Sequence, residues 1–243
     1  MVFDMQRYFI KKCEDKYRLQ DGDFHHVKDV MRIKSGENII CILDGVSYMS
    51  TINYRNDDYE IILGDVLSND NELNKKVIMY QALIKNDNFD FIIQKATELG
   101  VTDFYPVIFK RSVVKVNKDN YNSKLERYKK IIKEASEQSR RNVQMKIHNF
   151  IDVCNIKLHE NELGLFAYEN NKDKKALAKA LDNIDKYESI SYIVGPEGGF
   201  ENSEVEYLER AGFLNVSLGN RIFRSETASI FGLSLIVHYI EGR

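Results

Sequence analysis

Short runs of alternating apolar and polar residues fill the first 70 positions of the chain. The runs are rich in β-branched and aromatic residues, and turn signals such as Ser35-Gly36 and Asp44-Gly45 separate them. This pattern is typical of half-buried strands. Strands are expected at residues 7–10, 37–43, 48–54 and 59–66, and one helix at 25–32. Strands spaced by about ten residues favour a small all-β unit, a barrel.

From Lys76 onward the pattern changes to strands that alternate with longer stretches of helical periodicity. Strands are expected at residues 77–84, 103–108, 164–168, 190–195 and 215–218. Helices are expected from 86 or 87 to 100, from 123 to 139, from 203 to 212 and from 226 to 239. Two of them open on capping boxes, Ser123-x-x-Glu126 and Ser203-x-x-Glu206. Alternation of strand and helix predicts a mostly parallel α/β sheet.

A polar segment, residues 67–75, separates the two patterns. It lacks apolar periodicity and is rich in Asn and Asp, which is typical of a linker. The expected organisation is a β domain over residues 1–70 and an α/β domain over residues 71–243.

The composition excludes several classes of protein. With 43% hydrophobic and 30% charged residues the chain can bury a core. No apolar run approaches the roughly 20 residues of a membrane-spanning helix, and the first residues lack the apolar segment of a secretory signal. Three cysteines lie far apart without CxxC spacing, which argues against a disulfide framework and a cysteine zinc site. We therefore expect a soluble cytoplasmic protein, and no metal is implied.

Charge is segregated along the chain although the net charge is only −2. Residues 105–150 hold 12 Lys and Arg against 4 Asp and Glu, and the rest of the chain is acidic. Such asymmetry favours a surface that faces a polyanion, with interleaved tyrosines able to stack on bases. A solvated helix face is the alternative.

Two junctions between an expected strand and a helix carry candidate chemistry, because ligands of open α/β sheets bind at the carboxyl ends of strands. In the first, residues 192–200, an apolar strand runs into Gly-Pro-Glu-Gly-Gly, which lacks the lysine of a phosphate-binding loop. In the second, residues 216–229, a short loop carries Arg221 and Arg224, and Ser225 is expected to cap the last helix. That helix start could bind an anion or a nucleobase. Either junction alone is compatible with a structural role.

Lys95 and Glu98 lie three residues apart at the end of the first α/β helix, where a surface ion pair is the plain interpretation.

Taken together, these segments resemble a known family. The ordered stretches QKATELGV, RSVVK, EASEQSRR, IVGPEGGF and LGNRIFRSETA are similar to those of the RsmE family of 16S rRNA uridine-N3 methyltransferases, within the SPOUT class. The resemblance extends to Gln6-Arg7-Tyr8-Phe9 and to His26-x-x-x-Val30-Met-Arg32, so it spans essentially the whole chain. The chain departs from the family pattern at Phe223, where Leu is frequent, at Ser225, where Thr is frequent, and after Arg141, where a proline is absent.

The resemblance implies a fold and an activity. The α/β domain would contain a deep trefoil knot that holds S-adenosylmethionine, and the β domain would be PUA-like and grip RNA. A homodimer would place the active site near the subunit interface. The substrate would be a decoding-centre uridine of 16S rRNA in the small ribosomal subunit.

The resemblance also implies site residues. Those expected to bind the cofactor are Phe166, Tyr168, Glu169, Gly195, Pro196, Glu197, Gly198, Gly199, Leu218, Gly219, Ile222, Arg224 and Thr227. The polar residues expected nearest the transferred methyl are Glu98, Arg224, Glu226 and Thr227. The catalytic candidates are Arg224, Glu226, Glu98 and Glu197. RNA contacts are expected at Arg7, Arg32, Arg111, Arg140 and Arg141.

The chemistry requires an unpaired uracil whose N3 loses its proton. Arg224 could stabilise charge on the uracil carbonyl oxygens, and Glu98, Glu197 or Glu226 could accept the proton. Two rival functions are a non-catalytic RNA-binding assembly factor, which would not bind S-adenosylmethionine, and a phosphotransferase. The phosphotransferase is disfavoured because the chain lacks a phosphate-loop lysine and a paired-aspartate magnesium site.

Overall fold

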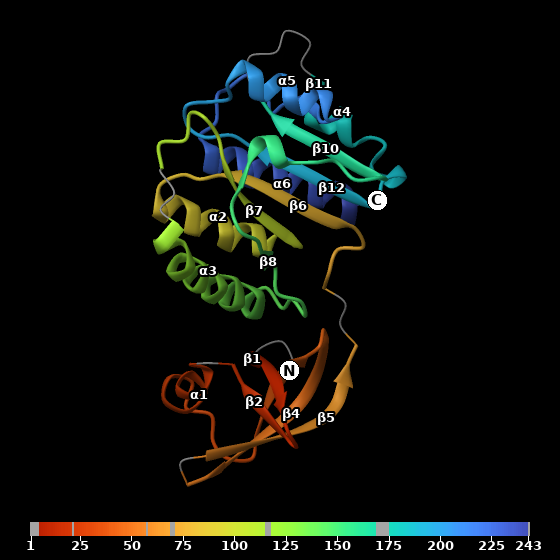
Figure 1. The fold of residues 1–243 in the computed structure, drawn as a ribbon. Helices are drawn as coiled ribbons and strands as arrows, with labels where there is room; N and C mark the ends of the chain where they lie inside the picture. The colour runs from red at the N-terminus through yellow and green to blue at the C-terminus, as the bar shows by residue number, and fades with distance from the viewer. Residues whose placement is uncertain are drawn as a thin grey trace. The chain divides into compact units, whose positions relative to one another are not determined.

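The structure is a computed structural model that describes residues 5–20, 22–56, 58–68, 71–114, 118–168 and 175–242. The chain forms two compact units (Figure 1). Unit 1 contains Met1–Glu72 together with Ser136–Val143, and unit 2 contains Leu73–Ala135 and Gln144–Arg243. The segment 136–143 therefore belongs to the β unit although it lies in the middle of the α/β sequence, an excursion that the hydrophobic pattern did not predict.

Unit 1 is a curled five-stranded sheet in the order β2-β1-β3-β4-β5. Its elements are β1 (Arg7–Cys13), β2 (Lys16–Leu19), α1 (Asp23–His25), the π-helix η2 (His26–Val30), β3 (Glu37–Leu43), β4 (Val46–Arg55) and β5 (Asp58–Leu67). Strands β1 and β3 are parallel, and the other pairs are antiparallel. The core of this unit includes Tyr8, Ile39, Cys41 and Ile52.

Side chains, not a backbone ladder, connect the two edge strands of unit 1. Arg18 of β2 donates to both carboxylate oxygens of Asp58 in β5, at 2.5 and 3.1 Å, and to the carbonyl oxygen of Tyr59 at 3.0 Å. The Tyr59 hydroxyl accepts from the backbone N–H of Leu19 at 3.0 Å. The expected barrel is thus confirmed only as a curled sheet.

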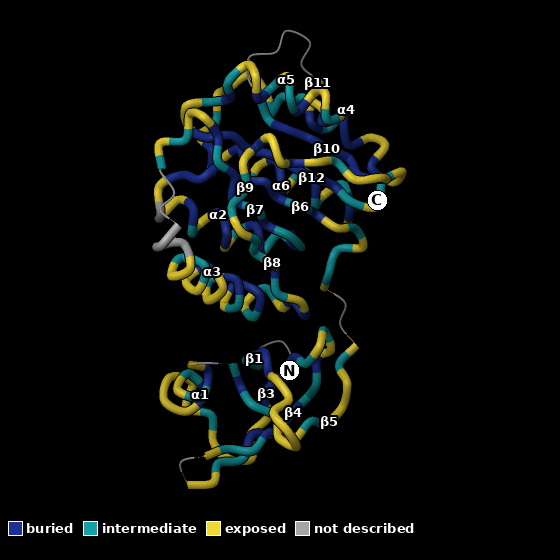
Figure 2. Tube along the Cα trace, in the orientation of Figure 1, coloured by how far each residue is buried: buried dark blue, intermediate teal, exposed yellow. Residues whose placement is uncertain are grey.

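Unit 2 is built on a sheet in the order β11-β13-β10-β12-β6-β7-β8, with β9 beside β7. Its strands are β6 (Lys76–Ala82), β7 (Asp103–Ile108), β8 (Lys146–Ile147), β9 (Ile151–Asp152), β10 (Glu162–Ala167), β11 (Lys175–Ala176), β12 (Ser189–Val194) and β13 (Leu214–Ser217). All pairings recorded in the described part of this sheet are parallel, as expected from the alternating pattern. Its central strands are buried (Figure 2).

Helices cover both faces of this sheet. They are α2 (Asn86–Glu98), α3 (Lys118–Gln138), the 3₁₀ turn η3 (Val153–Asn155), α4 (Leu177–Leu181), the 3₁₀ turn η4 (Ile184–Lys186), α5 (Asn202–Arg210) and α6 (Ser225–Glu241). One core joins side chains of α2, α3, α4 and α6 to the sheet, and a second core joins α5 and η3 to the opposite face. No helix in the described ranges is both long and apolar enough to span a membrane.

The helix starts differ from those expected. Helix α3 begins at Lys118, five residues before the expected cap Ser123, and Lys85 rather than Asn86 or Asp87 stands at the N-cap of α2. The capping box of α5 is formed by Glu201 and Glu204, not by Ser203 and Glu206. The reason is tertiary: the Glu204 carboxylate also accepts the backbone N–H of Lys110 at 2.8 Å, which fixes the register.

Candidate active site

The carboxyl ends of three adjacent strands, β10, β12 and β13, border one cavity of about 250 Å³. This is the edge of a parallel sheet where ligands bind. The cavity is lined by Ala167, Tyr168, Val194, Gly195, Pro196, Glu197, Gly199, Phe200, Val216, Ser217, Leu218, Gly219, Arg221, Ile222, Phe223, Arg224, Ser225 and Ala228.

One wall is the segment after β12, residues 195–200, which we call the pocket loop. Its turn is closed by the Gly199 N–H, which donates to the Pro196 carbonyl at 2.9 Å. Phe200 is buried at its end and meets the rings of Phe109, Phe166 and Tyr168 edge-on. A Cβ on Gly195 would lie 2.7 Å from the Phe200 ring, so glycine is required for the loop to fold this closely.

A buried polar network lies beneath the pocket. Gln81 of β6 donates to the Ser225 hydroxyl at 2.9 Å, and that hydroxyl donates to the Gly195 carbonyl at 2.8 Å. Ser229, one turn further along α6, donates to the Gln81 amide oxygen at 2.5 Å. The network ties the start of α6 to β6 and to the pocket loop. It also corrects the expected role of Ser225, because Arg224 holds the N-cap position and Ser225 is the first helical residue.

Charged side chains stand at the mouth of the cavity. Arg221, Arg224 and Glu197 are exposed and line it. Within the part of the chain that the structure describes, the side chains of Arg224 and Glu197 make no hydrogen bond or ion pair. Arg224 also lies beside the first N–H groups of α6, which have no partner within the helix and favour negative charge. The mouth therefore presents a guanidinium, a carboxylate and helix N–H groups to a bound molecule.

Most of the residues expected to bind a cofactor line this one cavity. The exceptions are Phe166, which is buried behind Phe200, and Gly198 and Thr227, which adjoin lining residues. Glu169 lies outside the described residues.

Of the expected catalytic residues, Arg224 and Glu197 line the cavity. Glu226 follows in the first turn of α6 without lining it. Glu98 lies at the end of α2, where Lys95 donates to its two carboxylate oxygens at 2.8 and 2.9 Å. The ion pair that the spacing suggested is therefore present.

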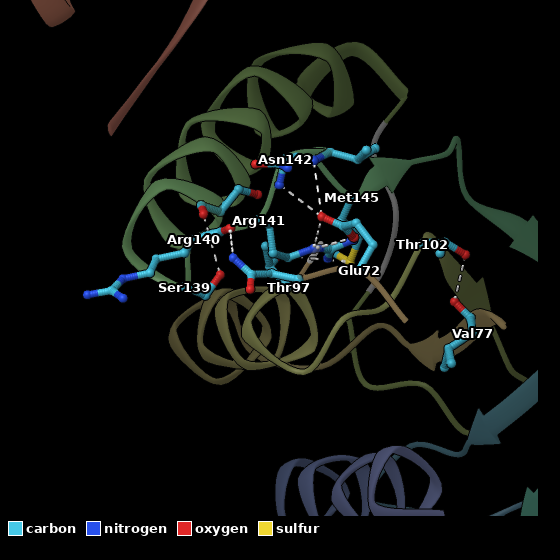
Figure 3. Close-up of polar contacts among 12 residues, drawn as sticks. Glu72, Val77, Thr97, Thr102, Ser139, Arg140, Arg141, Asn142 and Met145 are labelled. Carbon is cyan, nitrogen blue, oxygen red and sulfur yellow. Dashed lines mark hydrogen bonds and ion pairs between the residues drawn. The ribbon is translucent and has the colours of Figure 1, made fainter. Parts of the chain in front are cut away.

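Two of the expected RNA contacts are buried inside unit 1. The Arg7 guanidinium donates to Ser47 at 2.9 Å and to Asn142 at 2.7 Å, and burial lowers its pKa, with a smaller contribution from Arg140. The Arg141 side chain is only 3% exposed and pairs with Glu72 at 2.8 Å. The same carboxylate accepts the backbone N–H groups of Asn142 and Val143 (Figure 3). This geometry gives both arginines a structural role in binding the segment 136–143 to unit 1.

The other three expected RNA contacts are exposed. Arg32 follows η2 with a positive φ of 54°, and Arg140 has a φ of 63°. Arg111 follows β7 and pairs with Glu201 at 2.7 Å.

Comparison with known proteins identifies the family of this chain. The model of an RNA methyltransferase domain matches residues 71–237, and that of an RNA methyltransferase PUA domain matches residues 19–63. Ribosomal RNA small subunit methyltransferase E of Bacillus subtilis is 34% identical over 251 residues, covering 98% of each chain. The protein of the same name from Mesomycoplasma hyopneumoniae is 33% identical over 95% of this chain and 98% of its own. The chain belongs to the ribosomal RNA small subunit methyltransferase E family. It is an rRNA methyltransferase.

Solved structures agree with this assignment. A ribosomal RNA small subunit methyltransferase E from Neisseria gonorrhoeae, bound to S-adenosyl methionine, superposes with a TM-score of 0.80 at 28% identity, covering 95% of each chain. The methyltransferase Lpg2936 from Legionella pneumophila, in complex with the cofactor SAM, has a TM-score of 0.81 at 27% identity over 96% of each chain. These relatives confirm the expectation of an S-adenosylmethionine-dependent rRNA methyltransferase at the level of the family.

Sequence reasoning missed Gln81, which is fully buried in the network beneath the pocket. A glutamine near the end of an apolar strand was the only available signal, since a buried amide requires partners.

Proposed function

We propose that this protein transfers a methyl group from S-adenosylmethionine to N3 of a decoding-centre uridine in the 16S rRNA of the small ribosomal subunit. The observation that carries the proposal is the cavity at the ends of β10, β12 and β13, with Arg224 and Glu197 at its mouth. The family assignment supports the cofactor and the rRNA substrate, and the residue-level resemblance supports the uridine and its N3 atom.

The cavity suits the cofactor. Side chains of Val194, Leu218 and Phe223 give it apolar walls that fit a purine ring. Gly219 leaves its backbone accessible at the cavity, where a side chain would occupy open space, and Gly195 lets the pocket loop pack closely against Phe200. S-adenosylmethionine, when bound, supplies an electrophilic methyl group on a sulfonium. Tyr168, Pro196, Gly199 and Ile222 complete the proposed cofactor contacts.

Arg224 and Glu197 are the proposed catalytic residues. Uracil N3 becomes a nucleophile when its proton leaves, and the negative charge then spreads onto the two carbonyl oxygens. The Arg224 side chain, which is exposed and makes no hydrogen bond or ion pair among the described residues, would donate to one of these oxygens. Glu197 would accept the N3 proton directly or through one water. Glu226 is the alternative proton acceptor. Glu98 is a weaker candidate because its carboxylate is already paired with Lys95.

The deep trefoil knot is also part of the proposal. The first residue of α6, Ser225, forms a hydrogen bond with Gly195 at the end of β12. Helix α6 also contacts α4, which lies on the connection from β10 to β12. A chain end held behind such a crossover is the arrangement that a knot requires. The crossover includes residues 169–174, outside the described ranges, so a crystal structure that traces them is the test.

Exposed apolar side chains beside the pocket support a homodimer. Ile222 is 82% exposed, and Phe231 of α6, whose ring meets Phe223 at 5.4 Å between centroids, is 43% exposed. Large apolar groups exposed in one area mark association surfaces. Sedimentation at micromolar concentration should give a dimer for the wild type and a monomer for a Phe231→Asp variant.

The remaining assignments concern RNA and location. Residues 1–70 would form the PUA-like domain that binds rRNA, with Arg32 among its contacts, and residues 71–243 the SPOUT methyltransferase domain. Arg140, in the segment 136–143, would be a further RNA contact. The exposed basic side chains of α3, among them Arg127, Lys129 and Lys130, suit a phosphate backbone. A ribosomal substrate implies action in the cytoplasm.

The test is methyl transfer to purified small subunits from a strain that lacks this modification. Reverse transcriptase should stop at one decoding-centre uridine after incubation with enzyme and S-adenosylmethionine, because a methyl on N3 blocks base pairing. Free 16S rRNA, run in parallel, identifies the preferred substrate. A methyl group incorporated at another atom, which lets reverse transcriptase read through, would contradict the N3 assignment. No methyl incorporation into either substrate would contradict the activity.

A further inference from the structure

The four residues after β7, 109–112, form a short loop that contacts both the pocket loop and the start of α5. We call it the rear loop. The Arg111 side chain donates from Nε to Glu201 Oε1 at 2.7 Å and from a terminal nitrogen to the Gly198 carbonyl oxygen at 3.3 Å. A single guanidinium therefore binds the pocket loop and the N-cap residue of the helix that follows it.

A buried carboxylate anchors the rear loop. Glu204 is only 3% exposed, and its two oxygens accept the backbone N–H groups of Lys110 and Glu201, both at 2.8 Å. Lys110 also donates through Nζ to Ser203 at 2.9 Å. Because a buried carboxylate is costly without partners, this arrangement holds the rear loop firmly against α5.

Gly198 contacts the rear loop closely. A Cβ added there would lie 3.0 Å from Arg111 Cβ and 3.2 Å from the Arg111 carbonyl oxygen. Its neighbours Glu197 and Gly199 line the cavity, whereas Gly198 does not. The turn 196–199 thus has a cavity side and a rear side, and Arg111 covers the rear side.

We propose that Arg111 is a positioning residue for cofactor binding: through Gly198 and Glu201 it holds the pocket loop in the shape that binds S-adenosylmethionine, and it does not contact RNA. This inference rests on the proposed function, because it takes the cavity to be the cofactor site. It replaces the role in RNA binding that the charge pattern suggested for Arg111, and it assigns Gly198 to packing against the rear loop.

The expected effect is modest, because Arg111 and Glu201 are 48% and 39% exposed and exposed ion pairs contribute little. Loss of the guanidinium should weaken S-adenosylmethionine binding about two- to fivefold, the range that an exposed pair allows. Removal of either partner should have a similar effect, and removal of both should add little, because the two groups act through one contact.

The experiment uses full-length Arg111→Met, which keeps the aliphatic stem, Glu201→Gln, which keeps the capping oxygen, and the double variant. Arg210→Met is the matched control, since Arg210 is an exposed cation on the same helix α5 that bonds only to Glu206 among the described residues. Each protein is titrated with S-adenosylmethionine by calorimetry. KM for the cofactor, KM for small subunits and kcat are then measured separately, with thermal unfolding to confirm folding.

We predict that the Kd and the KM for the cofactor rise in both single variants and that these effects are not additive in the double variant. The KM for small subunits should stay unchanged in all three variants, and Arg210→Met should behave like the wild type. A raised KM for small subunits at unchanged cofactor Kd in Arg111→Met would overturn it in favour of an RNA contact. Wild-type cofactor binding in both single variants would overturn it in favour of a mere surface pair. The proposed function fails separately, if the wild type itself neither binds S-adenosylmethionine nor transfers methyl.

Discussion

The Ser225 hydroxyl lies 2.8 Å from the Gly195 carbonyl oxygen, which joins the first residue of α6 to the loop after β12 across 30 positions of sequence. The same hydroxyl accepts from Gln81 of β6. Two walls of the cavity and strand β6 are thus joined through one buried oxygen.

Replacement of Ser225 by alanine should damage both stability and cofactor binding. The Gly195 carbonyl and the Gln81 amide would lose a partner while buried, which costs about 1–3 kcal/mol. Denaturant unfolding measures the first effect and calorimetry with S-adenosylmethionine the second. Ser234→Ala, an exposed position of the same helix, is the control and should change neither. Unchanged cofactor affinity in Ser225→Ala would show that the network does not shape the pocket.

Arg224→Ala should slow methyl transfer with little effect on folding. Its side chain is exposed, so few native contacts are lost, but the donor aimed at the uracil oxygens disappears. Removal of one such donor costs about 10²-fold in rate. Single-turnover kinetics at saturating cofactor measures the step, with Arg210→Ala as the control. A single-turnover rate equal to that of the wild type would remove Arg224 from the catalytic step.

Arg141→Ala should destabilise the protein rather than selectively weaken RNA binding. Its guanidinium is buried against Glu72, and removal of one partner of a buried pair costs about 3 kcal/mol. Arg32→Ala, at an exposed position, should leave stability unchanged and weaken binding to small subunits. Denaturant unfolding and filter binding separate the two variants. Equal stability of the two would show that the buried pair contributes nothing.

The Arg18–Asp58 contact should make unit 1 sensitive to acid. The hydrogen bond from Arg18, with a second from the backbone at Tyr59, lowers the pKa of Asp58 to about 2. A carboxyl whose pKa is lower in the folded state stabilises the fold above its unfolded pKa of about 4, and the contribution is lost as the pH falls towards 2. Stability measured from pH 5 to pH 2 should therefore fall more steeply for the wild type than for Asp58→Asn. Parallel curves would mean that the contact does not contribute.

Much of the fold follows from local patterns. Strands 37–43 and 103–108 were predicted with their observed bounds, because both are apolar runs between clear turn signals. Strand β2, Lys16–Leu19, was missed, since the alternation in its sequence KYRL covers only four residues and its stability comes from pairing with β1.

The site was less predictable where tertiary contacts decide it. Two capping boxes overlap at the start of α5, and only the buried contact of Glu204 with Lys110 selects between them. The family resemblance placed Arg7 and Arg141 among the RNA contacts, and a sequence pattern does not distinguish buried from exposed arginines. The partners of both, Asn142 and Glu72, lie far away in sequence.

The central claim is that the cavity at the ends of β10, β12 and β13 binds S-adenosylmethionine. Calorimetric titration of the wild type, of Leu218→Arg and of Gly219→Arg tests it most directly, since both residues line the cavity and a Cβ at Gly219 would meet nothing within 4 Å. We predict binding to the wild type and loss of binding in both variants, each still giving a cooperative unfolding transition. A folded wild type that does not bind, or folded variants that bind as tightly as the wild type, would contradict the claim.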